Sequence, residues 1–492
     1  MHSAVSAETA AVESVAATID TAAPSSTAPA PGPAAKRIYS VGQTTWIRKT
    51  TEVREGEFLG YVRTGSSVPL RSNDRVKGVG CPGGFYQVAP RGYVCADRTV
   101  TDNPPAGFAA AAEATRGTTA ALPYRYALSD GAPMYNRIPT KKEQERYEPP
   151  WLHKPHVFHK LPKTLRSHEE LATNDVIEPT DEVPAFLQNG GSAKEGAYDL
   201  VEQTIPLGSM LSYTKAFEAD GRTWLLSADH TIVPADRVRP FRMSTFRGVD
   251  LVATKTKLPI AFMRVGAKPK YRKRGDSIDK TGAQWAVRTS VALSGASIEV
   301  GGKKYLEVNE NDDGGAQLYI AETDATVIDR EPDRPHGVKE KQKWFLIRLS
   351  QGTLVAYEDL EPVYATLVSP GRGGLPVKGR DNVQDSTTPT GAFSITFKDR
   401  AATMSPEKGK DRTFWISDVP YTQYFNPPFA LHAAYWHERF GEFVSAGCVN
   451  LSPLDAEALF TWSDPGVPLD WQGATGAGAK ENGATTIVVV RR

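Results

Sequence analysis

The chain has 492 residues, of which 40% are hydrophobic and 23% charged, and its formal net charge at pH 7 is +1. This length predicts two to four domains, and the balanced charge gives no reason to expect nucleic acid or an anionic membrane as a partner. No stretch approaches the ~18 continuous apolar residues of a membrane-spanning helix. The 42 glycines and 36 prolines favour turns and short strands over long helices.

Residues 1–37 are rich in Ala, Ser, Thr and Pro. The segment does not resemble a signal peptide, because it lacks a basic start and because Glu8 and Glu13 interrupt its apolar residues. Its composition predicts a disordered Ala/Pro-rich tether.

Residues 38–105 contain short runs of alternating apolar residues between Gly, Pro and Asp turns, which predict four or five strands. The stretch "LGYVRTGSSV…FYQVAPRGYVC" resembles bacterial SH3-like domains, small barrels that dock on cell-wall peptides or on a neighbouring domain. Cys81 and Cys95 flank a predicted hairpin. They would form a disulfide in an oxidising compartment and remain thiols in a reducing one.

Residues 106–340 are predicted to form one or two further β modules. Strand patterns surround Trp224 and Tyr305. The two patterns are similar, which is consistent with an internal repeat but does not establish one. The segment "DREPDRPHG", residues 329–337, is predicted to be a linker.

Two polar segments in this region are candidates for binding. His153, His156 and His159 have a spacing that could bring imidazoles together on a helix, but three prolines in the same segment break any helix, so we expect a surface loop and no metal site. The basic run at 268–280 could contact anionic polymers, although a solvated loop is the favoured interpretation.

Residues 341–492 are predicted to be strands with one short helix, "SPLDAEALFTW". Ser452 is a suitable N-cap, Pro453 suits the first turn, and Asp455 and Glu457 favour the positive end of the helix dipole.

The third cysteine, Cys448 in "FVSAGCVN", has no obvious disulfide partner. A reactive cysteine needs a base close by, and His432 and His437 both precede it, so spacing alone does not choose between them. Gly447 leaves room for a substrate carbonyl, and the N–H groups of Ala446, Gly447 and Cys448 could converge on an oxyanion. The alternative is a structural cysteine.

Three motifs in this region are similar to those of the L,D-transpeptidases, the YkuD-type enzymes. They are the hairpin "QGTLVAYEDLEPVYATLVSPG", the segment "TPTGAF" and the stretch "LHAAYWHERFGEFVSAGCVN". The resemblance implies a compact β-sandwich with a short helix for residues 341–492. The expected fold is therefore mostly β, with SH3-like barrel modules followed by this catalytic domain.

The resemblance also implies roles for individual residues. Cys448 would be the nucleophile, His432 its general base, and the main-chain carbonyl of Ala433 the group that orients His432. The oxyanion hole would consist of Ala446, Gly447 and Cys448. Residues expected to support the loop or to line the substrate cleft are Tyr435, Trp436, His437, Ser445 and Asn450.

One residue departs from the family pattern. The family usually has histidine directly before the Gly-Cys pair, where this chain has Ala446. His437 could compensate, or it could serve only in packing and hydrogen bonding. Three further residues have alternative interpretations. Asp418 is expected in a turn rather than as a triad acid, and Tyr421 and Tyr424 could edge the cleft or simply pack.

By resemblance, the expected function is formation of 3-3 cross-links between peptidoglycan stem peptides, without a cofactor, in the cell envelope. The same acyl-enzyme could instead be hydrolysed, which would make the protein an L,D-carboxypeptidase, or transferred to a protein. A non-catalytic cell-wall-binding protein is the alternative of a different class. The sequence does not predict the oligomeric state.

Overall fold

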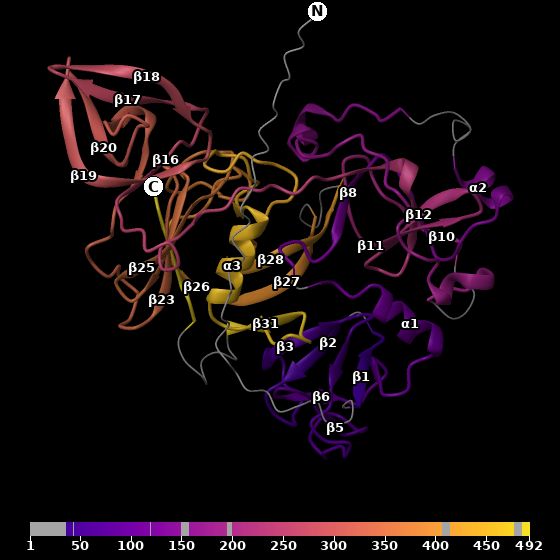
Figure 1. Ribbon diagram of the computed structural model, residues 1–492. Helices are drawn as coiled ribbons and strands as arrows, with labels where there is room; N and C mark the ends of the chain where they lie inside the picture. The colour runs from indigo at the N-terminus through magenta and orange to yellow at the C-terminus, as the bar shows by residue number, and fades with distance from the viewer. Residues whose placement is uncertain are drawn as a thin grey trace, which may run out of the picture. The chain divides into compact units, whose positions relative to one another are not determined.

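The computed structural model describes residues 36–42, 44–118, 120–148, 157–193, 199–405, 414–476 and 485–492. In this part of the chain strands far outnumber helices and form several sheets, which confirms the predicted mostly-β fold (Figure 1). Of the predicted tether, all but residues 36 and 37 lies outside the described residues, as do His153 and His156.

The N-terminal β module, defined here as residues 37–101, has a core formed by alternate strand residues such as Ile47 and Val62. Cys81 and Cys95 form a disulfide with 5.8 Å between their Cα atoms, the pairing that the sequence left open. Its strands are β1 (Arg37–Ser40), β2 (Thr44–Arg48), β3 (Phe58–Arg63), β4 (Ser67–Pro69), β5 (Phe85–Gln87), β6 (Tyr93–Cys95) and β7 (Val100–Thr101).

The next segment contains two α-helices that the expectation of β modules at 106–340 did not include. Helix α1 (Ala106–Ala114) is mostly alanine, the strongest helix former. Helix α2 (Lys141–Tyr147) begins with a capping box between Thr140 and Glu143. The other elements are β8 (Arg125–Ser129), β9 (Pro133–Tyr135), η2 (Lys163–His168), η3 (Ala185–Gly190), β10 (Val201–Thr204), β11 (Met210–Ala219), β12 (Arg222–Ser227), β13 (Ile232–Pro234), η4 (Ala235–Arg237) and β14 (Val238–Pro240).

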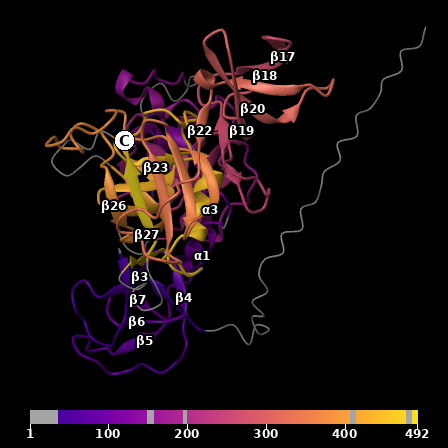
Figure 2. The same cartoon turned by 90° about the vertical axis from the view of Figure 1, so that its left-hand side faces the viewer.

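A seven-stranded sheet follows, in the order β18-β17-β21-β20-β19-β16-β22 (Figures 1 and 2). The expectation of a solvated loop at 268–280 was wrong, because these residues form a hairpin that turns at Gly275. The ring of Tyr271 packs on Tyr305 across this sheet, with 5.1 Å between ring centroids. The elements are β16 (Ile260–Phe262), β17 (Lys268–Arg274), β18 (Ser277–Trp285), β19 (Ser290–Val300), β20 (Lys303–Asn311), β21 (Gln317–Ala321), η5 (Glu322–Asp324) and β22 (Thr326–Ile328).

The C-terminal region packs two sheets and one helix around a core that includes Phe345, Leu431 and Leu459. Helix α3 (Pro453–Trp462) begins as predicted, with Ser452 Oγ accepting from the Asp455 N–H. One sheet consists of β15 (Val249–Asp250), β23 (Lys343–Arg348), β24 (Thr353–Glu358), β25 (Glu361–Leu367), β26 (Gly391–Ser394) and β32 (Ile487–Arg491). The strands of the other are β27 (Phe397–Met404), β28 (Ile416–Asn426), β29 (Phe429–Ala433), β30 (Val449–Leu451) and β31 (Gly473–Thr475).

The N-terminal β module and the C-terminal region share one sheet. Strand β31 pairs with β27 on one side and with β3 on the other, so the ladder β28-β27-β31-β3-β2 is continuous (Figure 1). Trp471, just before β31, is buried in the core of the N-terminal β module. Asp418 lies in β28 rather than in a turn, and its buried carboxylate pairs with Arg63 of β3 at 2.6 Å. Residues far apart in the sequence are thus joined by main-chain pairing, a buried ring and an ion pair.

Candidate functional site

The site is organised by two parallel strands. Strand β29 pairs with β30 so that His432 lies opposite Asn450 and Leu431 lies opposite Val449. Cys448 immediately precedes β30. The parallel pairing therefore brings the cysteine turn alongside the strand that carries His432, although sixteen positions separate them in the chain.

His432 is buried and its ring is held in one tautomer. Its Nδ1 lies 3.0 Å from the main-chain oxygen of Ala433. Since a carbonyl can only accept, Nδ1 carries the proton and Nε2 has a free lone pair. Burial lowers the pKa of His432 to about 4, partly opposed by the Ala433 carbonyl, so the imidazole is neutral at pH 7.

Cys448 is half-buried. Burial raises the pKa of Cys448 to about 11, although the main chain of Ala430 favours the thiolate. The thiol makes a weak hydrogen bond to the Pro428 carbonyl at 3.9 Å. At neutral pH the pair is therefore a thiol and a neutral imidazole rather than a preformed thiolate and imidazolium.

The turn that carries Cys448 is fixed by hydroxyl groups. Ser445 Oγ donates to the Cys448 carbonyl at 2.6 Å and accepts from the Gly447 N–H at 3.0 Å. Thr388, the first residue of the "TPTGAF" segment, donates to the Gly447 carbonyl at 2.8 Å and accepts from the Gly371 N–H at 3.0 Å. The sequence motif contained Thr388, but only the structure reveals that it supports the cysteine turn.

Gly447 is required by the shape of this turn. Its φ of +128° is a conformation that residues with a side chain rarely adopt, and a Cβ here would lie 2.6 Å from the Phe429 ring. The Gly447 N–H is occupied by Ser445 Oγ. It is therefore not free to act as an oxyanion donor in this arrangement, although the sequence suggested that role.

The residues that follow His432 differ in their placement. Tyr435 does not line a cleft, since it is 0% exposed, stacks on Tyr126 with 3.8 Å between ring centroids, and donates to a buried carbonyl. Trp436 lies beside His432, with 6.0 Å between the centroids of the two rings.

His437 and Asn450 form a buried pair. The Asn450 amide lies 3.0 Å from His437 Nε2, and the Arg439 N–H donates to His437 Nδ1 at 3.2 Å. Burial lowers the pKa of His437 to about 3, with a smaller contribution from the positive charge of Arg439. His437 is therefore neutral at pH 7 and supplies no positive charge to the thiol.

Residues from the middle of the chain hold the loop that follows His432. The Leu171 N–H donates to the Trp436 carbonyl at 3.2 Å, and the carboxylate of Glu438 pairs with Arg242 and Arg288 at 3.1 and 3.3 Å. This loop, which leads from the histidine toward the cysteine, thus depends on segments outside the C-terminal region.

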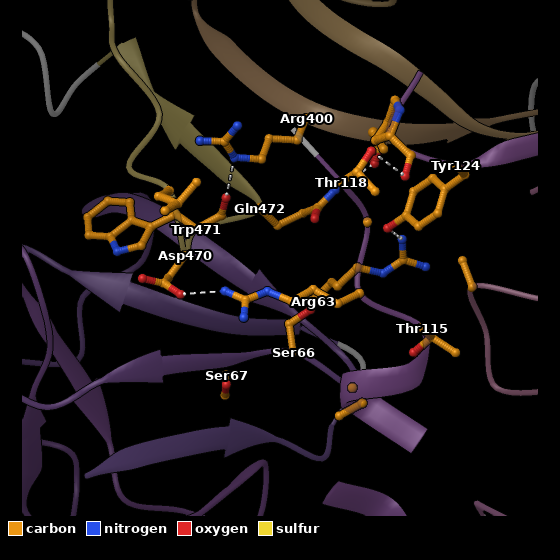
Figure 3. Close-up of a pocket in the computed structure, with 18 of the residues that line it drawn as sticks. Arg63, Ser66, Ser67, Thr115, Thr118, Tyr124, Arg400, Asp470, Trp471 and Gln472 are labelled. Atoms are coloured by element: carbon orange, nitrogen blue, oxygen red, sulfur yellow. Dashed lines mark hydrogen bonds and ion pairs between the residues drawn. The ribbon is translucent and has the colours of Figure 1, made fainter. Parts of the chain in front are cut away.

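A cavity of about 500 Å³ lies away from this site, between the N-terminal β module, the segment after α1 and the β27 region (Figure 3). Arg63, Tyr124, Arg400 and Asp470 are among its lining residues, whereas Cys448 and His432 are not. Among the described residues no group of three or more His, Cys, Asp or Glu side chains could hold a metal ion. None of the described helices is long and apolar enough to cross a membrane.

Comparison with known proteins identifies the region that contains the site. Residues 342–470 match the family model of the L,D-transpeptidase catalytic domain, YkuD. No curated protein matches the chain.

Several solved structures are similar to parts of this chain. An L,D-transpeptidase from Xylanimonas cellulosilytica is 24% identical over 32% of this chain and 65% of its own, with a TM-score of 0.22. One from Stackebrandtia nassauensis is 25% identical over 31% of this chain and 57% of its own, with a TM-score of 0.20. One from Mycobacterium tuberculosis is 16% identical over 48% of this chain and 96% of its own, with a TM-score of 0.21. The chain thus spans less than two thirds of the first two structures.

The family match covers β23 to the end of α3, and therefore both strands that carry the site. Residues 342–470 of this chain form an L,D-transpeptidase catalytic domain of the YkuD family.

Proposed function

We propose that the protein is a peptidoglycan L,D-transpeptidase that forms 3-3 cross-links through a cysteine acyl-enzyme. The observation that carries the proposal is the cysteine turn held beside strand β29, within the residues that match the family. In this proposal Cys448 is the nucleophile, His432 is the base, and the Ala433 carbonyl fixes the ring of His432.

The reaction begins from the neutral pair. His432 Nε2 takes the thiol proton as Cys448 Sγ attacks the carbonyl at the L-centre of the third residue of a tetrapeptide stem. The same imidazolium then donates its proton to the amine of the departing D-alanine, which leaves a thioester. An amine of a second stem attacks the thioester, gives its proton to Nε2, and releases the thiolate, which recovers the proton.

The low pKa of His432 suits the second of these steps, whereas the first step is uphill and requires transfer of the proton to be concerted with attack on the carbonyl. An imidazolium with a pKa of about 4 is a strong acid, so it readily protonates the leaving amine. Because Gly447 donates to Ser445, the oxyanion would rely on the N–H groups of Ala446 and Cys448. The thioester conserves the energy of the broken amide, so cross-linking outside the cell needs no nucleotide.

The remainder of the chain is assigned by the same proposal. The N-terminal β module would be an SH3-like domain, and the segments between it and the catalytic domain would position the loop after His432. The substrates would be peptidoglycan stem peptides, and the site of action would be the cell envelope.

Mass spectrometry of the products formed from purified tetrapeptide muropeptides tests this proposal, with Cys448→Ala and His432→Ala variants as controls. Dimers that have lost one D-alanine, absent with both variants, are expected. Tripeptides alone would identify an L,D-carboxypeptidase, and stem peptides coupled to an added protein would identify an anchoring enzyme. Unchanged substrate with the wild-type protein would overturn the proposal and favour a wall-binding protein.

A further inference from the structure

A single row of aromatic rings crosses the shared sheet. Its members are Trp46, Phe58, Tyr61, Phe397 and Tyr424. Ring centroids are 4.3 Å apart between Trp46 and Phe58, 5.6 Å between Trp46 and Tyr61, 5.9 Å between Tyr61 and Phe397, and 6.3 Å between Phe397 and Tyr424. Trp46 is 38% exposed and the other four rings are half-buried, so the row lies at the surface.

Two irregularities of the sheet produce this row. The pairing of β2 with β3 shifts register between Ile47 and Arg48, which lets Phe58 and Tyr61 lie near Trp46 although three positions separate them. On β31, Gly473 has no side chain to separate the rings of its neighbours: a Cβ there would lie 2.7 Å from Tyr61 and 2.8 Å from Phe397. The rings therefore meet across β31, the strand that joins the N-terminal β module to the catalytic domain.

The row ends beside the turn that carries Cys448. Phe397 lies opposite Tyr424 in the β27–β28 ladder, and Tyr424 in turn lies opposite Ala430 of β29. The carbonyl of Pro428, two residues before Ala430, accepts the weak hydrogen bond from the Cys448 thiol at 3.9 Å. A chain-like ligand that follows the rings from Trp46 would therefore arrive at the thiol.

We propose that this row is a track for a glycan strand of N-acetylated amino sugars, which it leads to the cysteine that attacks the attached stem peptide. This inference rests on the proposed function and names the polymer that carries its donor. Each aromatic face bears partial negative charge that attracts the C–H groups on the face of a pyranose ring.

The dimensions and the polar groups of the row favour a glycan over a protein partner. A stable protein interface buries about 800 Å² on each partner, whereas this row is one ring wide. Arg48 lies 5.1 Å from the centroid of Phe58. Its guanidinium therefore borders the exposed end of the row, where it can donate to the hydroxyl and acetamido oxygens of a sugar.

Calorimetric titration of the full chain with N-acetylglucosamine oligomers of one to six units tests this proposal, since it needs no catalysis. Trp46→Ala is the test variant, because Trp46 is exposed and lies outside the hydrophobic core of the N-terminal β module. Trp46→Phe keeps an aromatic face, and Tyr147→Ala removes a ring of similar exposure, 46%, at the end of α2. Cys448→Ala leaves the track unchanged.

We expect affinity to rise with oligomer length, and the hexamer to bind Trp46→Ala about two- to tenfold more weakly than the wild type. Trp46→Phe should recover most of this loss, while Tyr147→Ala and Cys448→Ala should match the wild type. The proposal is overturned if the wild type does not bind the hexamer, or if Trp46→Ala binds it equally well. It is also overturned if a sugar-free tetrapeptide, and not the hexamer, loses affinity in Trp46→Ala. Since binding and turnover are measured separately, hexamer binding without muropeptide products would refute only the proposed reaction.

Discussion

Trp471→Ala is predicted to loosen the N-terminal β module from the catalytic domain while the catalytic core stays folded. Trp471 is 1% exposed, and its indole ring lies within the hydrophobic core of the N-terminal β module. The indole N–H donates to the Ala89 carbonyl at 2.9 Å, and the ring lies against Gly60 of β3, where an added Cβ would be 2.6 Å away. The substitution thus removes the largest apolar side chain that the C-terminal region inserts into this module.

The expected cost follows from the burial. A tryptophan buries about 150–250 Å², which corresponds to about 4–6 kcal/mol at ~25 cal/mol per Å². Substitutions of buried tryptophan by alanine typically cost about 3–5 kcal/mol. The pairing of β3 with β31 and the Arg63–Asp418 ion pair remain, so the module should stay attached. The free energy of its local opening should fall by about 3–5 kcal/mol.

Hydrogen exchange followed by mass spectrometry measures this change for each segment. A loss of 3–5 kcal/mol predicts exchange about a hundred- to several-thousand-fold faster in β2 and β3, with little change in β23 to β25. Trp415→Ala is the matched control, because Trp415 packs against a different hydrophobic cluster, around Leu211 and Val238. Unchanged exchange in β2 and β3, or equal acceleration throughout the chain, would refute the reasoning.

Four further results are expected. The rate of Cys448 alkylation by iodoacetamide should still increase between pH 8 and 10, because burial raises the thiol pKa to about 11. His432→Ala should slow alkylation at pH 7. A rate that reaches a plateau above pH 7 would contradict the raised thiol pKa. Burial raises the pKa of Asp399 to about 6 from 3.8, so the folded state binds a proton that the unfolded chain releases. Stability should therefore fall by as much as about 3 kcal/mol as pH rises from 4 to 6, and Asp399→Asn should remove this dependence in thermal melts. Gly447→Ala should abolish activity with an unchanged circular dichroism spectrum, because its φ of +128° and the crowded turn exclude a side chain. Thr388→Val should lower kcat by about tenfold or more, because it leaves buried groups of the cysteine turn unpaired at a cost of about 1–3 kcal/mol; an unchanged kcat would argue against this support.

The sequence alone predicted those elements that interactions between near neighbours in the chain determine. Alternating apolar residues between turns identified the strands of residues 38–98 and of the C-terminal region, because side chains of a strand alternate between its two faces. Ser452 and Pro453 marked the start of α3 for a similar reason, since an N-cap satisfies backbone groups within one turn. The capping box of α2 was present in the sequence too, between Thr140 and Glu143, and could have revealed that helix.

The sequence also selected Cys448 and His432 as candidates and connected them to a family whose catalytic-domain model matches residues 342–470. It could not determine the state of their protons. The pKa shifts of both groups arise from burial, which depends on what the rest of the chain packs around them. The same packing buried Tyr435, a residue that the sequence placed in the cleft, beneath Tyr126 from a segment about three hundred positions earlier.

The sequence by itself determined the strands, the start of α3 and the two candidate reactive residues, because these follow from alternation, capping and motif spacing. Tertiary structure alone decided that Trp471 completes the core of a distant module, that Asp418 pairs with Arg63, and that Gly473 lets rings from β3 and β27 meet. These contacts join residues hundreds of positions apart. No local pattern specifies them, because the partner of a buried ring or charge is chosen by the whole fold.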